Sequence, residues 1–270
     1  MDFLITGGAS GVGAALVNRL NDHNVWIVDR SKPTEIASKH QFIAADLSSE
    51  DGVEQVLASL PENIDGIANV AGIAQAPEPE TVLAVNFLAL RTLSESLIAR
   101  LSDWGRIVNV SSTAGRDWQG KYDRLKPLLA TASFQAGLTW CQENRDLLAR
   151  DPYTFSKRMV TAYTLRAAER AINGGFTVNS VSPGPIETPL YPQFESLMGK
   201  EHSDWTKAQT GRSATPDDIA QVIEMLLTAE CGWLNGVDIP VDGGYTAGME
   251  SGWIDFSESP IMQKIRERKS

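Results

Sequence analysis

The sequence predicts a single α/β domain built on a doubly wound parallel sheet of about seven strands, with helices on both faces. The first observation is that short apolar runs alternate along the chain with segments whose apolar residues recur at helical spacing. Such alternation is typical of parallel strands joined by right-handed helical crossovers. The second observation is length, because 270 residues suit one large domain and no Pro/Ser-rich or charged stretch divides them. We therefore treat residues 1–270 as one domain.

Each predicted element corresponds to one of these runs. Apolar runs predict strands near residues 2–6, 24–29, 41–45, 64–71, 105–112, 175–182 and 236–241. Helical spacing of apolar residues predicts helices near residues 11–21, 49–60, 80–101, 152–172 and 215–229. Two stretches do not fit the alternation, a helical insertion at about 113–151 and a C-terminal extension at about 245–270.

A glycine-rich turn follows the first predicted strand. Residues 6–13 read TGGASGVG, and the segment AALVNRL that follows has apolar residues at helical spacing. The order of strand, glycine turn and helix forms a cradle for a nucleotide phosphate, because glycine permits a tight turn and lets the anion approach the helix N-terminus. The turn therefore predicts cofactor contacts at Gly7, Ser10, Gly11, Val12 and Gly13.

The second predicted strand ends in Asp29, whose carboxylate suits the adenosine ribose hydroxyls of a dinucleotide. Arg30 follows, but Asp29 would repel a 2′-phosphate and the glycine turn holds no basic residue. These residues predict NAD rather than NADP, with a plain surface aspartate as the alternative. The next two strand ends place further predicted cofactor contacts beside the ligand: Asp46, Leu47, Asn69, Ala71 and Gly72.

Tyr153 and Lys157 lie four residues apart at the start of the helix predicted at 152–172. Residues at this spacing project from one helix face, and Asp151 as N-cap with Pro152 at the first helical position supports a helix start here. Free tyrosine has a pKa of about 10, so it needs a nearby ammonium to act as a base near neutral pH. The pair predicts a Tyr153 base assisted by Lys157, although such pairs also occur on surface helices without a function.

Hydroxyl groups end the strand predicted at 105–112, at the sheet edge where α/β proteins bind ligands. Ser112 is the expected hydrogen-bond partner of a substrate oxygen, and Ser111 is the alternative. After the strand predicted at 175–182, a Pro-Gly turn leads to a threonine that suits the carboxamide of a nicotinamide. The predicted cofactor contacts here are Pro183, Gly184, Ile186 and Thr188.

With these residues assembled, the chain resembles the short-chain dehydrogenase/reductase family over about residues 2–244. The matching elements are the Thr6–Gly13 turn, Asp46, Asn69-Val70-Ala71-Gly72, Asn86 within Ala84-Val85-Asn86-Phe87, Ser112, Tyr153 with Lys157, Pro183-Gly184 with Thr188, and Asp242-Gly243-Gly244. The resemblance implies a Rossmann-type fold and a catalytic tetrad of Asn86, Ser112, Tyr153 and Lys157. It further implies that Tyr153 moves the alcohol proton, Ser112 polarises the reacting oxygen, Lys157 binds the nicotinamide ribose and lowers the pKa of Tyr153, and Asn86 holds a water in a proton relay.

The long connection between Ser112 and Tyr153 departs from the family pattern. Within it, apolar residues at helical spacing predict an amphipathic helix over 133–149, after a helical candidate at 124–131. The stripe consists of Phe134, Leu138, Cys141 and Leu148. An insertion at this place resembles the bacterial 3α-hydroxysteroid dehydrogenase/carbonyl reductase branch and related aryl-alcohol dehydrogenases.

The insertion also bears on the oligomer. In many relatives two long helices, corresponding here to about 80–101 and 152–172, pack against symmetry mates in a tetramer. We expect the insertion to obstruct that contact, and we therefore expect a homodimer formed through another surface, such as the strand near 236–241.

The segment after Thr188 is rich in large apolar side chains, as a lid over a hydrophobic substrate would be. Its alternative is an amphipathic helix that simply packs on the body. The expected substrate contacts are Ser112, Leu190, Tyr191, Phe194 and Met198. Residues 259–270 are expected to form a solvated terminal helix.

Taken together, these features predict an NAD-dependent oxidoreductase that interconverts a hydrophobic secondary alcohol, such as a steroid, terpenoid or aromatic alcohol, and its carbonyl compound. A reductase of acyl-thioester or sugar and polyol substrates is the enzymatic alternative. An NAD-sensing scaffold is the non-enzymatic alternative, and the presence of all four tetrad residues disfavours it.

Charge and composition disfavour several other classes. The net charge of −10 disfavours binding to nucleic acid or to an anionic membrane. Two cysteines, Cys141 and Cys231, and three scattered histidines predict neither a disulfide framework nor a metal site. Because no apolar run reaches membrane-spanning length and the first strand begins at residue 2 or 3, we expect no signal peptide and a cytoplasmic protein.

Overall fold

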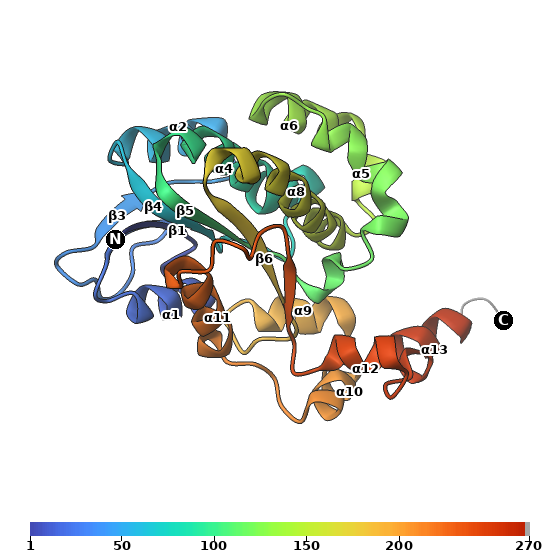
Figure 1. Ribbon diagram of the computed structural model, residues 1–270. Helices are drawn as coiled ribbons and strands as arrows, with labels where there is room; N and C mark the ends of the chain where they lie inside the picture. The colour runs from blue at the N-terminus through green and yellow to red at the C-terminus, as the bar shows by residue number, and fades with distance from the viewer. Residues whose placement is uncertain (268–270) are drawn as a thin grey trace.

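The computed structural model, which describes residues 1–267, has a seven-stranded parallel sheet at its centre (Figure 1). The strand order is β3-β2-β1-β4-β5-β6-β7, which confirms the predicted doubly wound sheet. The strands are β1 (Asp2–Thr6), β2 (Asn24–Asp29), β3 (Gln41–Ala44), β4 (Ile64–Asn69), β5 (Leu101–Val110), β6 (Thr177–Pro183) and β7 (Asp238–Val241). The winding reverses between β1 and β4, and in such sheets ligands bind at the carboxyl ends of the strands beside this point.

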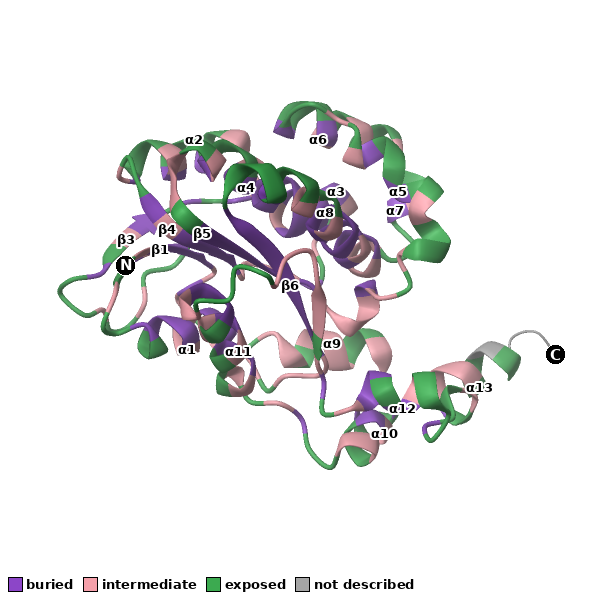
Figure 2. Cartoon of the chain, viewed as in Figure 1, coloured by how far each residue is buried: buried purple, intermediate pink, exposed green. Residues whose placement is uncertain are grey.

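Helices cover the two faces of the sheet as separate layers (Figure 1). One layer contains α1 (Gly11–Arg19) and α11 (Pro216–Thr228), which pack against each other. The other contains α2 (Glu50–Ser59), α4 (Ala89–Leu97) and α8 (Pro152–Gly174). Each layer has its own cluster of buried apolar residues, so the strands between them are buried on both faces (Figure 2). Burial on both faces explains why their sequences are continuous apolar runs rather than alternating ones.

The helix predicted at 80–101 is one continuous helical stretch, Pro79–Arg100, that changes type along its length. It begins as α3 (Pro79–Leu83), widens into a π-helical turn at Ala84–Leu88, and continues as α4. Among the described residues it is the one helix long and apolar enough to cross a membrane, but 67% of its most apolar window is buried inside the protein. Burial of this kind is typical of the core helix of a globular domain.

Strand β5 differs from the prediction at both ends. It begins at Leu101, where it pairs with Ile64, and a register shift follows before Gly66 pairs with Arg106. Trp104 lies in this irregular part and has φ +66°, which is rare for a bulky residue. The strand ends at Val110, so the predicted range 105–112 was wrong at its end and both serines lie beyond the strand. Strands β4 and β6 also shift, by about two residues, from 64–71 and 175–182.

The insertion packs on its own subunit. It forms α5 (Tyr122–Leu129), α6 (Phe134–Glu143) and α7 (Arg145–Leu148). The single helix predicted over 133–149 was wrong, because the helix is interrupted at Asn144. The predicted apolar stripe is buried in the core cluster except for Leu138, which is partly buried. Arg91 of α4 supports the break between α5 and α6, because its guanidinium donates to the carbonyls of Leu128, Thr131 and Ser133.

The segments after β6 and β7 form a helical group at the edge of the molecule (Figure 1). The first supplies α9 (Tyr191–Met198) and α10 (Lys200–Thr210), and the second supplies α12 (Tyr245–Ser251) and α13 (Pro260–Glu267). The prediction of a terminal helix is confirmed over Pro260–Glu267. This helix contacts α10, and Lys264 forms an ion pair of 3.0 Å with Glu201. The last residues of the predicted 259–270 helix, 268–270, lie outside the described part of the chain.

Candidate active site

The glycine turn packs closely against two other segments of the chain, at Ala71 and at Thr188. Gly7 and Gly11 have φ of +70° and +53°, which L side chains rarely adopt. A Cβ on Gly7 would lie 2.7 Å from the Ala71 backbone, and a Cβ on Gly13 would lie 2.1 Å from the Gly7 carbonyl oxygen. The turn thus packs tightly at the N-terminus of α1, where Ser10 is the N-cap and Val12 is buried. A helix N-terminus of this kind is suited to binding an anion.

Asp29 lies at the end of β2 against the glycine turn. Its carboxylate accepts hydrogen bonds from the backbone N–H of Ala9 (3.2 Å) and of Ser31 (3.2 Å). The next strand end brings Asp46 and Leu47 to the same edge, because the Ala45 N–H donates to the Asp29 carbonyl (3.1 Å). Burial acts to raise the pKa of Asp46, but hydrogen bonds from Ser48 and the positive charge of Arg30 lower it. The net result is a pKa below the usual value.

The end of β4 is held by buried polar side chains. Asn69 donates to Ser94 Oγ (3.0 Å) and to Asn109 Oδ1 (2.9 Å), while the Thr6 hydroxyl accepts from the backbone N–H of Ala71 (3.1 Å). Asn69 therefore supports the shape of the strand edge through its side chain. Gly72 lies close to two residues of the predicted tetrad, since a Cβ there would be 3.4 Å from Asn86 Oδ1 and 3.6 Å from Lys157 Nζ.

Tyr153 and Lys157 lie on the first turns of α8, which begins as predicted. Asp151 caps the helix by accepting from the Thr154 N–H (3.0 Å), and Pro152 occupies its first position. The Ser112 hydroxyl hydrogen-bonds the Tyr153 phenol, and Lys157 Nζ lies 5.7 Å from the centre of the Tyr153 ring. The structure thus brings Ser112, Tyr153 and Lys157 together from two different segments of the chain.

The pKa values of this pair are shifted in opposite directions by the same cause. Burial raises the pKa of Tyr153 to about 12, although the hydrogen bond from Ser112 acts to lower it. Burial lowers the pKa of Lys157 to about 8, and its ammonium donates to the Val110 carbonyl (2.9 Å). In both cases the neutral form is favoured because the charged form loses solvation. Strongly shifted groups of this type concentrate at functional sites.

Ser111 and Ser112 have different surroundings. The Ser111 hydroxyl is buried beside α8, where it donates to the Lys157 carbonyl (3.0 Å) and lies 2.7 Å from Thr161 Oγ1. Ser112 is the serine that contacts the Tyr153 phenol, and it also accepts from the Ala114 N–H (3.2 Å). Its neighbour Gly115 packs closely on α8, since a Cβ there would lie 2.6 Å from the Lys157 carbonyl.

Asn86 lies in the π-helical turn and its side chain is fully engaged. Its Oδ1 accepts from the Ile73 N–H (2.8 Å), and its Nδ2 donates to the Ile73 carbonyl (3.0 Å) and to Ser156 Oγ (3.0 Å). Both amide hydrogens are therefore committed to protein groups. The side chain joins the loop after β4 to α8 and leaves no amide hydrogen for a water.

The loop after β6 closes the other side of the glycine turn. Gly184 begins it with an N–H that donates to the Val241 carbonyl (3.2 Å), and Ile186 forms an isolated bridge with Ala214. Thr188 then comes against Gly11, where a Cβ would lie 3.3 Å from Thr188 Cγ2. Pro183, the last residue of β6, is buried. The predicted cofactor contacts of the glycine turn and of the loop after β6 thus lie close to each other.

Helix α9, in the segment that we expected to form a lid, contacts Tyr153. The Phe194 ring of α9 meets the Tyr153 ring edge-on with 4.8 Å between centroids. Helix α9 has no fully buried residue, and Leu190, Tyr191 and Met198 are half-buried along it. The structure therefore places Phe194, one of the expected substrate contacts, against the ring of Tyr153.

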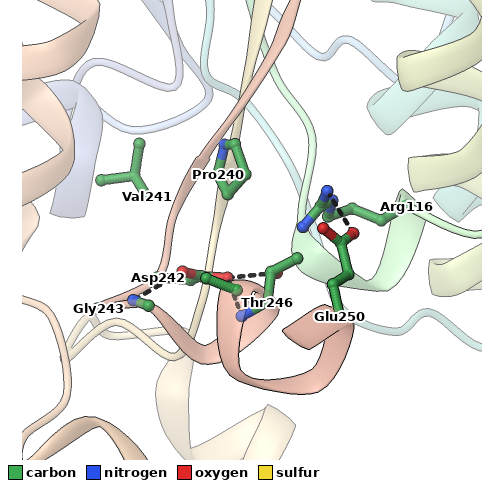
Figure 3. Close-up of a pocket in the computed structure, with 9 residues that line it drawn as sticks. Arg116, Pro240, Val241, Asp242, Gly243, Thr246 and Glu250 are labelled. Carbon is green, nitrogen blue, oxygen red and sulfur yellow. Dashed lines mark hydrogen bonds and ion pairs between the residues drawn. The ribbon is translucent and has the colours of Figure 1, made fainter. Parts of the chain in front are cut away.

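A cavity of about 370 Å³ lies away from these residues, between β7, α12 and the loop after Ser112 (Figure 3). Arg116 and Glu250 form an ion pair of 3.0 Å at one side of it, and Asp242 hydrogen-bonds Thr246 at the other. Neither Tyr153 nor the glycine turn lines this cavity. We therefore place the candidate active site at Tyr153 and not at this cavity.

Sequence reasoning missed Ser156 and the backbone groups of Ile73 and Val110. Ser156 accepts from Asn86 and donates to the Tyr153 carbonyl (2.7 Å), and Val110 supplies the carbonyl for Lys157. A signal for Ser156 was present, because a hydroxyl stands beside Lys157 in a helix. The roles of the Ile73 and Val110 carbonyls could not be predicted from side-chain patterns, because every residue type has a backbone carbonyl.

Comparison with known proteins gives consistent matches along the chain. Residues 3–122 match the family model described as short chain dehydrogenase, and residues 124–246 match the model described as Enoyl-(Acyl carrier protein) reductase. Coniferyl-alcohol dehydrogenase from Pseudomonas sp. strain HR199 is 32% identical over 243 residues, covering 89% of this chain and 94% of that protein. Cyclohexanol dehydrogenase from Acinetobacter sp. strain SE19 is 27% identical, covering 90% and 94%.

A solved structure has the same fold and similar length. The 3-alpha-hydroxysteroid dehydrogenase from Pseudomonas sp. B-0831, complexed with NADH, superposes with a TM-score of 0.76 at 29% identity and covers 93% of this chain and 99% of that one. The fold, the matched models and the alcohol dehydrogenases among its relatives agree, and the chain is an oxidoreductase that belongs to the short-chain dehydrogenase/reductase family, in its hydroxysteroid and alcohol dehydrogenase-like branch.

Proposed function

We propose that the protein is an NAD-dependent dehydrogenase that interconverts a hydrophobic secondary alcohol and its carbonyl compound, with Tyr153 as general acid and base. The observation that carries the proposal is the joint placement of Ser112, Tyr153 and Lys157 beside the glycine turn. When bound, NAD supplies the hydride acceptor of the reaction.

The residues around the glycine turn fit a dinucleotide. Gly7 and Gly13 pack too closely on the backbone of Ala71 and of Gly7 to accept a Cβ, so only glycine permits the tight turn at the start of α1 that dinucleotide-binding folds use. Asp29 faces the turn with its carboxylate and would hold the adenosine ribose, which favours NAD over NADP. The proposed contacts are Gly7, Ser10, Gly11, Val12, Gly13, Asp29, Arg30, Asp46, Leu47, Asn69, Ala71, Gly72, Tyr153, Lys157, Pro183, Gly184, Ile186 and Thr188.

The proton chemistry follows from the shifted pKa values. With a pKa of about 12, Tyr153 holds its proton in the free protein near neutral pH. A positive charge beside the ring lowers a phenol pKa, so the charged form of Lys157 and an oxidised nicotinamide would each favour the phenolate. Tyr153 can then accept the alcohol proton during oxidation and return it during reduction, while the Ser112 hydroxyl orients the reacting oxygen.

Asn86 has a supporting part in this proposal. Because its two amide hydrogens are used by Ile73 and Ser156, we assign its side chain to holding the active-site walls rather than to binding a relay water. The π-helical turn at this residue disturbs the regular backbone bonding of the helix, a feature that is frequent at functional sites.

The substrate class is inferred from the lid. Phe194 lies edge-on to the Tyr153 ring, so a substrate whose oxygen reaches Tyr153 would place its carbon skeleton against an aromatic wall. An aromatic or alicyclic alcohol suits that wall, and the relatives named for coniferyl alcohol, cyclohexanol and a hydroxysteroid support this choice. We also propose a cytoplasmic location, in keeping with the burial of the apolar helix Pro79–Arg100 in the core.

The test is a screen of aryl alcohols, hydroxysteroids, alicyclic alcohols and polyols with NAD, following NADH absorbance. We expect turnover with aromatic or alicyclic alcohols and little with polyols. The Tyr153→Phe variant keeps the ring but loses the ionisable hydroxyl, so its activity should fall by about 10²–10⁴-fold while NADH binding persists. Near-normal turnover in this variant would refute the assignment of the base, and turnover restricted to polyols would refute the substrate class.

A further inference from the structure

Ser156 occupies a buried position between the two reactive residues of α8. It has no exposed surface, and its Oγ takes part in two hydrogen bonds inside the protein. The hydroxyl donates to the Tyr153 carbonyl (2.7 Å) and accepts from Asn86 Nδ2 (3.0 Å). Through these two bonds it connects the backbone of Tyr153 to a different helical stretch.

The connection continues on the far side of Asn86. The Asn86 amide is bonded at both ends to the backbone of Ile73, by a donated bond of 3.0 Å and an accepted bond of 2.8 Å. The chain of contacts therefore runs from the loop after β4, through Asn86 and Ser156, to the first turn of α8. Hydrogen bonds in such water-free surroundings are strong, and an unpaired donor there is costly.

We propose that Ser156 is a positioning residue for the reaction, which holds the turn of α8 carrying Tyr153 against Asn86 and so sets the direction in which the phenol points. The proposal rests on the function proposed above. Ser156 does not touch the phenol itself, and its effect passes through the Tyr153 backbone. Because catalysis is sensitive to displacements of the order of 1 Å, a small shift of this turn affects the reaction more than it affects the fold.

The same helix contains a matched control. Thr164, two turns further along α8, has no exposed surface and makes the same two kinds of bond. Its Oγ1 donates to the Val160 carbonyl (2.8 Å) and accepts from Asn109 Nδ2 (2.9 Å). A buried hydroxyl with equal chemistry is thus available away from Tyr153, and it separates loss of a buried hydrogen bond from loss of positioning.

The experiment compares Ser156→Ala with Thr164→Val. Both remove a hydroxyl and leave an asparagine amide short of one acceptor, so both should lower the unfolding midpoint. We expect kcat of alcohol oxidation to fall about tenfold in Ser156→Ala, within the sensitivity known for misplaced groups, and to stay within twofold in Thr164→Val. The KM for NAD should stay within twofold in both. The activity limb governed by Tyr153 should move to higher pH only in Ser156→Ala, because a displaced phenol loses the hydrogen bond from Ser112.

A second measurement does not depend on turnover. Amide hydrogen exchange in residues 153–157 should quicken in Ser156→Ala relative to wild type, and Thr164→Val should leave that segment unchanged. Unchanged exchange there overturns the proposal whether or not a substrate has been found. If wild type is active, equal kcat and equal pH limbs in Ser156→Ala and wild type also overturn it.

Failure of the proposed function and failure of the Ser156 proposal give different results. A wild-type protein that oxidises no alcohol contradicts the proposed function, while the exchange data still decide whether Ser156 holds the turn. Should Ser156→Ala not fold, the near-isosteric Ser156→Cys, with a weak S–H donor, should give intermediate kcat and exchange rates. Wild-type values for both in Ser156→Cys would contradict the role of the hydrogen bonds.

Discussion

At the scale of single residues, the site depends on two side chains whose neutral forms are favoured by burial. Burial sets the pKa of Tyr153 at about 12 and that of Lys157 at about 8. Near neutral pH the phenol therefore keeps its proton in the free protein, while Lys157 can still carry its ammonium charge. The proposed chemistry depends on positive charge beside Tyr153, which Lys157 and an oxidised nicotinamide would both bring.

The first prediction at this scale concerns Lys157. Oxidation requires the phenolate, so its rate should rise with pH as Tyr153 ionises. Lys157→Met removes an ammonium that stabilises the phenolate, so this limb should move to higher pH. The measurement is kcat against pH at saturating NAD, and Lys126→Met on the exposed surface of the insertion is the control. A limb that stays in place in Lys157→Met would show that the lysine charge does not act on Tyr153.

The second prediction concerns Asp29 and the choice of nucleotide. Asp29 accepts from the Ala9 N–H within the glycine turn and would lie against a 2′-phosphate. Asp29→Ala removes the charge repulsion, so the ratio of kcat/KM for NAD over NADP should fall by about tenfold or more. The control is Asp22→Ala, which removes an exposed charge at the opposite end of β2. A wild type that uses both nucleotides equally would contradict the assignment of NAD.

At the scale of elements, the C-terminal segment and the lid are joined by an aromatic cluster. Trp205 of α10 stacks on His202 (5.8 Å between centroids) and meets the rings of Tyr245 (6.1 Å) and Phe256 (6.2 Å) edge-on. Helix α10 also packs against α9, which carries Phe194. The C-terminal segment is therefore connected through α10 to the helix that contacts Tyr153. Burial lowers the pKa of His202, so the cluster holds it neutral.

The prediction at this scale is that Trp205→Ala loosens the lid. The free energy of unfolding should fall by about 2 kcal/mol, less than for a fully buried tryptophan because Trp205 is half-buried. The KM for the alcohol should rise more than kcat falls, because the proton-transfer residues lie on other elements. Trp233→Ala is the control, since that side chain is 99% exposed. Equal KM values for the alcohol in Trp205→Ala and wild type would show that the C-terminal segment does not affect substrate binding.

At the scale of the whole molecule, the insertion covers one face of the helical stretch Pro79–Arg100 and part of α8. Helices α5, α6 and α7 pack on α3, on the π-helical turn and on α8 of the same chain. An ion pair between Arg145 and Glu80 adds to this attachment. The apolar stripe of the insertion is therefore already buried within one subunit and is not offered to a neighbour.

We predict a homodimer formed through the β7 edge rather than through the insertion. Light scattering should give a dimer for wild type and a monomer for Pro240→Glu, which places a charge on the exposed part of β7. Gln142→Glu, on the exposed side of α6, should leave the dimer intact. A wild-type tetramer, or a dimer that dissociates in Gln142→Glu and not in Pro240→Glu, would contradict this arrangement.

The sequence by itself determined the features that depend on local geometry. The alternation of strands and helices, the glycine turn, the cap at Asp151 and the spacing of Tyr153 and Lys157 follow from residues close together in the chain. Helix and strand periodicity place such residues in space without reference to the rest of the molecule. For this reason the fold class and the Tyr153–Lys157 pair could be predicted, and element ends erred by only a few residues outside β5.

Only the tertiary structure decided which distant groups meet. It placed Ser112 rather than Ser111 against Tyr153, used both amide hydrogens of Asn86 on Ile73 and Ser156, and brought Phe194 over the phenol. It also showed that the insertion packs on its own subunit and that the C-terminal segment supports α10. These contacts join residues far apart in sequence, and their partners are chosen by the packing of whole elements, which no local pattern specifies.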